Sequence, residues 1–211
     1  MSGLIGKKIG MTSIFDDNGR IRPCTVIEAG PCTITQIKDQ KKDGYNAIQL
    51  SYDELSKKKV NKPISGHFKK SSSQPKKKIV EFKNFRSKEL KLFKLGMELK
   101  LSDIFRENDF LDVKSISKGK GFQGVVKRHN FSGVGESTHG QHNRLRAPGS
   151  IGQASWPSRV FKGLRMAGQS GDSYVTSENL EIVDIDKEKN LLYVKGSVAG
   201  ANNGIVFILK K

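Results

Sequence analysis

The sequence predicts a mainly β protein in which a small barrel or meander, built from the two ends of the chain, carries a basic insert and a long internal loop. Three observations lead to this prediction. Short strand-like runs separated by turn residues occur at both ends of the chain. The net charge of +17 is concentrated in the middle. Residues 114–171 hold eleven of the 22 glycines, and beyond Arg128 they sustain neither a helical nor a strand period.

The charge distribution separates the ends of the chain from its middle. Basic and acidic side chains number seven and seven in residues 1–56, sixteen and seven in 57–113, ten and one in 114–171, and five and six in 172–211. The first and last segments are therefore expected to form near-neutral barrel halves, the second a basic α/β insert with a returning strand, and the third an extended glycine-rich loop. A protein this basic is expected to bind nucleic acid rather than a membrane surface.

The first 52 residues contain four strand-like runs, which are Leu4–Phe15, Arg20–Glu28, Cys32–Lys38 and Asn46–Tyr52. Asn18-Gly19 follows the first run, and Asp43-Gly44 precedes the fourth. Both dipeptides are typical of tight hairpin turns, because their residues tolerate positive φ. Strands at this spacing indicate a meander or a small barrel.

The predicted insert begins with a lysine-rich stretch. Nine lysines and no acidic residue lie between Lys57 and Lys78. Two interpretations remain open for this stretch, a solvated surface segment or an arm that contacts phosphates. Ile79–Phe85 alternates like a strand, Leu90–Leu101 fits neither period, and Phe110–Ile116 has the pattern of a strand that leads into the loop.

Strand patterns return after the loop. The runs are Tyr174–Ser177, Leu180–Asp186, Leu191–Val194 and Ile205–Leu209. We expect them to close the sheet that the N-terminal strands begin. Within the loop, Gly121–His129 is the one segment expected to form a short helix, with its apolar side chains on one side.

Two cysteines are too few for a disulfide scaffold. A tight turn at 28–31 would place Cys32 opposite Ile27 rather than opposite Cys24, so both thiols are expected to be reduced. No apolar run approaches the ~20 residues of a membrane span, and no stretch resembles a signal peptide. These features predict a cytosolic protein that does not bind membranes.

Two motifs suggest catalysis or cofactors, and their context argues against both. Gly119-Lys-Gly-Phe-Gln-Gly124 matches the dinucleotide fingerprint, but the acidic residue expected about 20 positions later is missing. With Val126 the same glycines also match the glycine loop of a kinase, but the other kinase motifs are missing. His139 and His142 would need two further ligands to hold zinc, and Glu136 is the only acid near them. The sequence therefore predicts no metal, no cofactor and no catalytic residues. Glycines beside lysines instead suit close contact with phosphates.

A series of motifs in order along nearly the whole chain resembles the bacterial large-subunit (50S) ribosomal protein L3 family. The motifs are Gly3-Leu-Ile-Gly-Lys-Lys-Ile-Gly-Met-Thr12, Gly66-His-Phe68, Ser117-Lys-Gly-Lys-Gly-Phe-Gln-Gly124, Pro148-Gly-Ser-Ile-Gly-Gln153, Val160-Phe-Lys-Gly163, Met166-Ala-Gly-Gln169 and Asn190-Leu-Leu-Tyr-Val-Lys-Gly196. The resemblance implies a six-stranded, translation-factor-like β-barrel with an α/β insert.

The same resemblance implies what the protein binds. The loop would penetrate 23S rRNA toward the peptidyl transferase centre, and the protein would take part in early subunit assembly beside neighbouring large-subunit proteins. The glutamine that the family methylates corresponds to Gln153. This correspondence implies N5-methylglutamine at Gln153 and a protein-glutamine methyltransferase as a partner.

Cationic and planar side chains are the candidate rRNA-binding residues, because cations displace condensed counterions and planar groups stack beside bases. The candidates are Lys7, Lys8, Lys118, Lys120, Lys127, Arg128, His129, His139, His142, Arg144, Arg146, Trp156, Arg159, Lys162 and Arg165.

We predict a structural, non-enzymatic component of the large ribosomal subunit, located in the cytoplasm. Two alternatives come from other classes. One is an RNA-modifying or RNA-processing enzyme that uses the basic loop as a substrate guide, and the scarcity of acids in the loop disfavours it. The other is a DNA-compacting architectural protein, which would bind duplex DNA as well as structured RNA.

Overall fold

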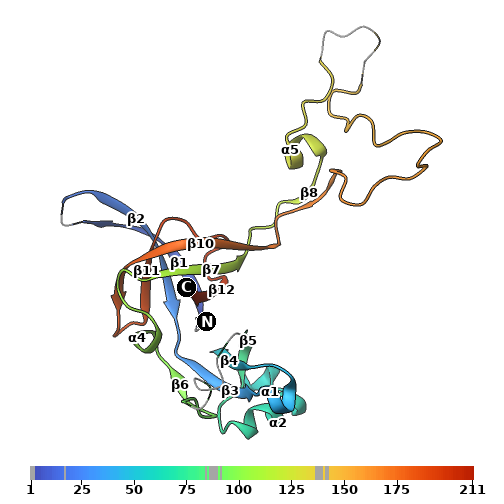
Figure 1. The fold of residues 1–211 in the computed structure, drawn as a ribbon. Helices are drawn as coiled ribbons and strands as arrows, with labels where there is room; N and C mark the ends of the chain where they lie inside the picture. Colours follow the sequence, from blue (N-terminus) through green and yellow to red (C-terminus); the bar gives the residue numbers. More distant parts are fainter. Residues whose placement is uncertain are drawn as a thin grey trace. The chain divides into compact units, whose positions relative to one another are not determined.

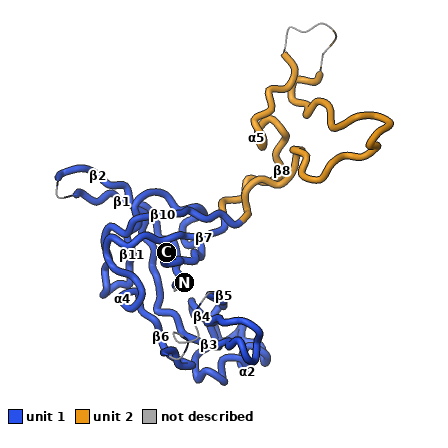
Figure 2. The backbone as a smooth tube through the Cα atoms, viewed as in Figure 1, with its two compact units in different colours: residues 1–116, 174–211 blue, residues 117–173 orange. Residues whose placement is uncertain are grey.

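The computed structural model describes residues 3–16, 18–83, 85, 90, 92–135, 140 and 143–211. The chain forms two compact units (Figure 2). Unit 1 comprises residues 1–116 and 174–211, and unit 2 comprises residues 117–173. Each unit is described by itself.

Unit 1 contains a closed barrel of six strands (Figure 1). Around the barrel the strands are β1 (Gly3–Phe15), β12 (Ile205–Lys210), β7 (Phe110–Ile116), β10 (Tyr174–Asp186), β11 (Leu191–Lys195) and β2 (Ile21–Ala29). Every neighbouring pair is antiparallel. The predicted six-stranded barrel and the mainly β fold class are confirmed.

A second sheet of unit 1 has the strand order β5-β4-β3-β6. Its strands are β3 (Cys32–Lys38), β4 (Ala47–Glu54), β5 (Lys76–Lys83) and β6 (Glu98–Leu99). Its helices are α1 (Gln40–Asp43), the 3₁₀ helix η1 (Lys57–Lys59), α2 (Lys62–Lys70) and α4 (Leu101–Ile104). Gly44 ends α1 in the left-handed conformation, with φ of 80°, so the predicted turn before β4 is a short helix and its cap.

The predicted origin of the barrel strands needs correction. Residues 32–56 were expected in the barrel, yet β3 and β4 pair with each other and with β6 and β5 in the second sheet. The strand β7, which was assigned to the insert 57–113, belongs to the barrel between β12 and β10. Its buried side chains Leu111, Val113 and Ser115 alternate with more exposed ones and face one side. Strand patterns reveal such alternation but do not reveal the pairing partner.

One hydrophobic core joins the barrel to the second sheet. It includes Leu4 and Ile208 of the barrel together with Ile34, Leu50 and Phe82 of the sheet. Gly3 lies where the two meet, because a Cβ atom there would overlap the carbonyl oxygen of Ile208 and the ring of Phe82. The barrel and the sheet therefore pack as one body.

Both cysteines are buried and free, as predicted. The Sγ atom of Cys32 lies 3.4 Å from the carbonyl oxygen of Ile5, to which the thiol donates. Burial raises the pKa of Cys32 to about 11 and also raises the pKa of Cys24. Both thiols therefore behave as small core residues rather than as nucleophiles.

Unit 2 begins and ends with a two-stranded ladder, in which β8 (Gly121–Gln123) pairs with β9 (Gly168–Ser170). Helix α5 (Val125–His129) follows β8 and ends at Asn130, whose φ is 57°. The helix is therefore shorter than the predicted range 121–129, because Gly121–Gln123 pairs as a strand and Gly124 is the N-cap. Between α5 and β9, the described residues form no helix or strand.

Candidate RNA-binding surface

The loop of unit 2 presents its cations to solvent. All nine lysines and arginines of residues 117–173 are exposed, namely Lys118, Lys120, Lys127, Arg128, Arg144, Arg146, Arg159, Lys162 and Arg165. Among the residues that the structure describes, none of the nine forms an ion pair. Their charge is therefore not neutralised within the described protein, and the loop attracts anions.

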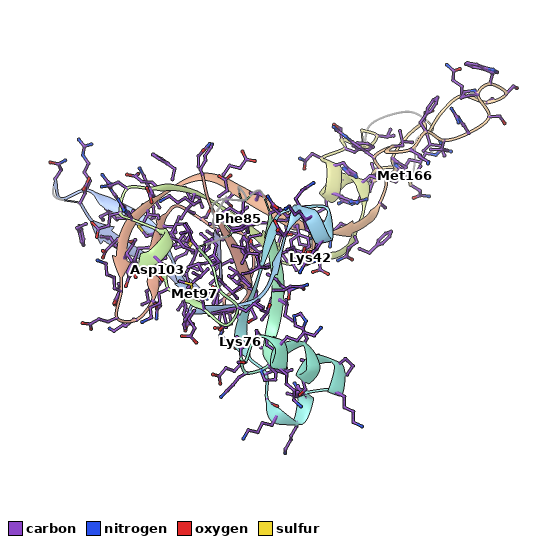
Figure 3. The ribbon with its side chains drawn as sticks, turned by 60° about the horizontal axis from the view of Figure 1, so that its bottom comes forward. Lys42, Lys76, Phe85, Met97, Asp103 and Met166 are labelled. Carbon is purple, nitrogen blue, oxygen red and sulfur yellow. The ribbon has the colours of Figure 1, made fainter. Side chains whose placement is uncertain are left out.

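The described part of unit 2 has almost no hydrophobic core. Val125 is its only buried residue. The apolar side chains that would ordinarily pack are instead exposed, including Ile151, Leu164 and Val160. Figure 3 shows side chains standing out along the loop backbone on both sides of Met166. Contacts within this unit do too little to fix its shape, so we expect a partner surface to do so.

Two predicted site residues, Arg128 and His129, stabilise the base of the loop. The Arg128 Nη1 atom donates to the carbonyl oxygen of Met166 at 2.8 Å, and the His129 Nε2 atom lies 3.0 Å from the same oxygen. Gly168 leaves room for the guanidinium, because a Cβ atom there would lie 2.7 Å from Nη1. These contacts hold α5 against the segment that enters β9, while the Arg128 side chain stays exposed.

Planar side chains of the loop are open to solvent. Trp156 is 81% exposed and Phe122 is 76% exposed, fractions that exclude a core role in this unit. The Arg159 guanidinium carbon lies 5.3 Å from the centroid of the Phe161 ring, a cation–π arrangement. Exposed rings and guanidinium planes are the groups on which unpaired bases stack.

Glycines permit close backbone approaches in the loop. A Cβ atom at Gly133 would overlap the carbonyl of Leu145, and one at Gly171 would overlap the carbonyl of Lys118. Both glycines have φ of 71°, in the left-handed region that other residues rarely adopt. These approaches fold the loop back on itself without a core.

The N-terminal candidates, Lys7 and Lys8, lie in the barrel rather than in the loop. Lys7 is half-buried on β1. Lys8 is buried, and its Nζ atom donates to the carbonyls of Val198 at 2.8 Å and of Gly200 at 3.3 Å. The ammonium group of Lys8 therefore binds backbone carbonyls inside the protein, and a contact of Lys8 with rRNA stays a prediction. His139 and His142 lie outside the described residues.

The lysine-rich stretch 57–78 folds as part of the second sheet. Phe68 of α2 is buried, and the His67 Nε2 atom lies 2.7 Å from the Gln49 side-chain oxygen. Seven of its nine lysines are exposed, namely Lys57, Lys58, Lys59, Lys62, Lys69, Lys70 and Lys77. The stretch is thus a folded, cationic surface, and both interpretations of it remain open.

A pocket that the sequence did not indicate combines cations with aromatic rings. It lies in unit 1, where Lys78, Lys114, Tyr174 and Phe207 line one pocket. These residues come from four separate strands, β5, β7, β10 and β12. Since the four strands are far apart in the sequence, no local pattern could have identified the pocket.

No cluster of three or more histidine, cysteine, aspartate or glutamate side chains that could hold a metal ion occurs among the described residues. None of their helices is long and apolar enough to span a membrane.

A family model and a curated protein both match this chain. A family model described as "Ribosomal protein L3" matches residues 31–191. A curated protein, "Large ribosomal subunit protein uL3" of Salinibacter ruber (strain DSM 13855 / M31), is 50% identical over 210 residues. The alignment covers 100% of this chain and 99% of that protein.

Proposed function

Because this chain belongs to the ribosomal protein L3 family, we propose that its loop unit, residues 117–173, binds 23S rRNA in the large ribosomal subunit. Membership makes the protein a structural component of the large subunit of the cytoplasmic ribosome and not an enzyme. Membership therefore excludes the alternative of an RNA-modifying or RNA-processing enzyme.

The observation that carries the proposal is that unit 2 exposes nine cations, while only one of its described residues is buried. Each cation placed on a phosphate releases condensed counterions, which favours binding. Arginine bridges phosphate oxygens with two parallel hydrogen bonds, and glycine lets the backbone approach them closely. The rRNA then supplies the packing surface that the loop lacks.

The same argument supports an early role in assembly. A loop that becomes ordered only on rRNA couples its own folding to binding. The near-neutral barrel gives it a stable base, while the loop enters rRNA that has not yet reached its final packing. We place the tip of the loop toward the peptidyl transferase centre, as its resemblance to the family implies. Neighbouring ribosomal proteins would contact the barrel and the second sheet.

Gln153 is the proposed modification site, and a protein-glutamine methyltransferase is the proposed partner for it. The side chain is exposed, directly after Gly152. Methylation would replace one N–H donor of the amide by an apolar group. Mass spectrometry of the ribosome-bound protein checks the proposal, and an unmodified Gln153 peptide would refute it.

The salt dependence of binding to a 23S rRNA fragment tests the proposed function. We expect the logarithm of the binding constant to fall steeply from about 50 mM to about 200 mM salt, with a slope of roughly −0.7 to −0.9 per phosphate contact. Replacing Lys118 and Lys120 by Gln should make the slope shallower by roughly 1.4 to 1.8, for two lost contacts.

Lys187 and Lys189 provide a matched control, because they are an exposed lysine pair with the same spacing on the β10–β11 turn of the barrel. Replacing both by Gln should leave the slope unchanged. A flat salt response of the unmodified protein, or equal effects of the two double variants, would contradict rRNA binding by the loop.

A further inference from the structure

A pocket of about 470 Å³ opens between the outer face of the barrel and the edge strand β5 of the second sheet. The strand registers explain its lining. Phe207 of β12 lies opposite Lys114 of β7, and Lys114 lies opposite Thr176 of β10. Tyr174, two residues before Thr176, therefore shares the face of Lys114 and Phe207. From β5, Val80 faces the same space.

Two aromatic rings form an open platform in this pocket. The centroids of Tyr174 and Phe207 are 6.3 Å apart, with 39° between the ring planes. Tyr174 is 55% exposed, whereas Phe207 is half-buried and packs against the core. Phe207 is therefore fixed by the core, while the ring of Tyr174 is accessible to a ligand.

Cations flank the platform. The Nζ atom of Lys114 lies 5.0 Å from the Tyr174 centroid, and that of Lys78 lies 5.7 Å from the Phe207 centroid. Each ammonium group is thus placed beside a ring edge or face while keeping hydrogen-bond donors for another partner.

The one carboxylate in the lining of the pocket, Glu81, is already neutralised. Glu81 has an ion pair with Lys38, whose Nζ atom is 2.7 Å from Oε1, and it accepts a hydrogen bond from the Tyr45 hydroxyl at 2.9 Å. These bonds to Lys38 and Tyr45 lower the pKa of Glu81. Lys83 also lines the pocket and adds a further positive charge to it. The pocket therefore keeps its positive potential.

We propose that this pocket binds an unpaired RNA base, which stacks on Tyr174 above Phe207 while Lys78 and Lys114 bind the flanking phosphates. The proposal rests on the proposed function, since it takes the anionic partner to be RNA. Aromatic platforms with flanking cations are the standard means of holding single-stranded nucleic acid. The volume also lies within the range of about 300–1,000 Å³ that suits a ligand of nucleotide size. An apolar protein side chain would gain nothing from the ammonium groups, so RNA is favoured over protein.

The test uses the full chain and two probes of equal charge, a six-residue oligoadenylate and its abasic ribose-phosphate analogue. Replacing Tyr174 by Leu should weaken oligoadenylate binding about 5- to 150-fold, the loss expected from one stacked base. Binding of the abasic analogue should not change. Ultraviolet cross-linking followed by peptide mass spectrometry should find the adenylate adduct at Tyr174.

Two variants serve as controls. Tyr174→Phe keeps the ring and should keep the affinity. Phe110→Leu removes a ring of similar exposure, 56%, from β7 outside the pocket, and it should have no effect.

The outcomes separate this inference from the proposed function. If the unmodified protein binds the 23S rRNA fragment with the expected salt dependence while Tyr174→Leu leaves oligoadenylate binding unchanged and Tyr174 gains no adduct, the pocket inference fails alone. A protein partner in the pocket would give that same result. If the unmodified protein does not bind the fragment, the proposed function fails.

Discussion

Single residues on β1 determine how closely other strands approach it. Gly3 lies against the Ile208 carbonyl and the Phe82 ring, whereas a Cβ atom at Gly10 would meet nothing within 4 Å. Gly10 instead follows a β-bulge, because the pairing of β1 with β2 shifts between Lys8 and Gly10. Two glycines with the same place in a strand pattern thus have different structural roles.

Replacing Gly3 by Ala should lower the free energy of unfolding by about 1–3 kcal/mol, the usual cost of forcing an extra group into a packed core. Gly10→Ala on the same strand should stay within about 0.5 kcal/mol of the unmodified protein. Urea unfolding followed by circular dichroism measures both. Equal effects of the two substitutions would show that β5 does not pack against β1 as described.

Lys8 lies on the same strand, and the sequence could not predict its surroundings. The sequence shows two adjacent lysines, and neighbouring residues of a strand point to opposite faces. Only the structure shows which of the two faces inward, where it meets the carbonyls of Val198 and Gly200. Those carbonyls lie some 190 residues away in the chain, so no local pattern predicts the contact.

At the scale of secondary-structure elements, local sequence patterns predicted several strands correctly. The run Cys32–Lys38 and the run Phe110–Ile116 are strands with the predicted bounds. The runs Tyr174–Ser177 and Leu180–Asp186 belong to one strand, β10. Its pairing with β7 shifts between Ser177 and Leu180, and this irregularity separates the two runs in the sequence pattern. Alternation and turn residues reveal strands, whereas sheet membership depends on long-range packing. This is why β3 and β4 were assigned to the wrong sheet.

The loop and the barrel strands should differ sharply in amide hydrogen exchange. Among the described residues of 130–160, one hydrogen bond between two backbone groups is found, from the Ala147 amide to the Arg144 carbonyl at 3.1 Å. In contrast, β7 is paired on both sides. In the free protein, we therefore expect fast exchange in 130–160 and slow exchange at Val113.

Exchange mass spectrometry on peptides, with and without the 23S rRNA fragment, measures this difference. The fragment should slow exchange in 130–160 and leave the already slow β7 peptides unchanged. Strong protection of 130–160 in the absence of RNA would mean that the loop is ordered without its partner.

At the scale of the whole molecule, the loop unit is an insertion between two paired strands. Ile116 of β7 and Tyr174 of β10 lie directly opposite each other. Removing residues 117–173 therefore leaves two strand ends that a tight turn can join. The positive charge of the middle was evident from the sequence, but the position of the insertion point on the barrel followed only from the pairing of β7.

Replacing residues 117–173 by Asn-Gly should give a folded barrel, because this dipeptide suits a two-residue hairpin turn. We expect one cooperative urea transition and a much weaker, less salt-dependent affinity for the 23S rRNA fragment. A second variant with an uncharged Gly-Ser loop of the original length separates the effect of charge from that of length. An unfolded Asn-Gly variant would show that unit 2 is needed for the fold of unit 1.

The place of β12 in the barrel has a consequence for synthesis on the ribosome. This strand hydrogen-bonds to β1 on one side and to β7 on the other, and it is the last of the six barrel strands in sequence order. A growing polypeptide therefore holds two open sheet edges until residues 205–210 emerge, since chains are made from the N-terminus. The cationic residues 117–173 emerge earlier, so the nascent protein can contact RNA before β12 closes the barrel.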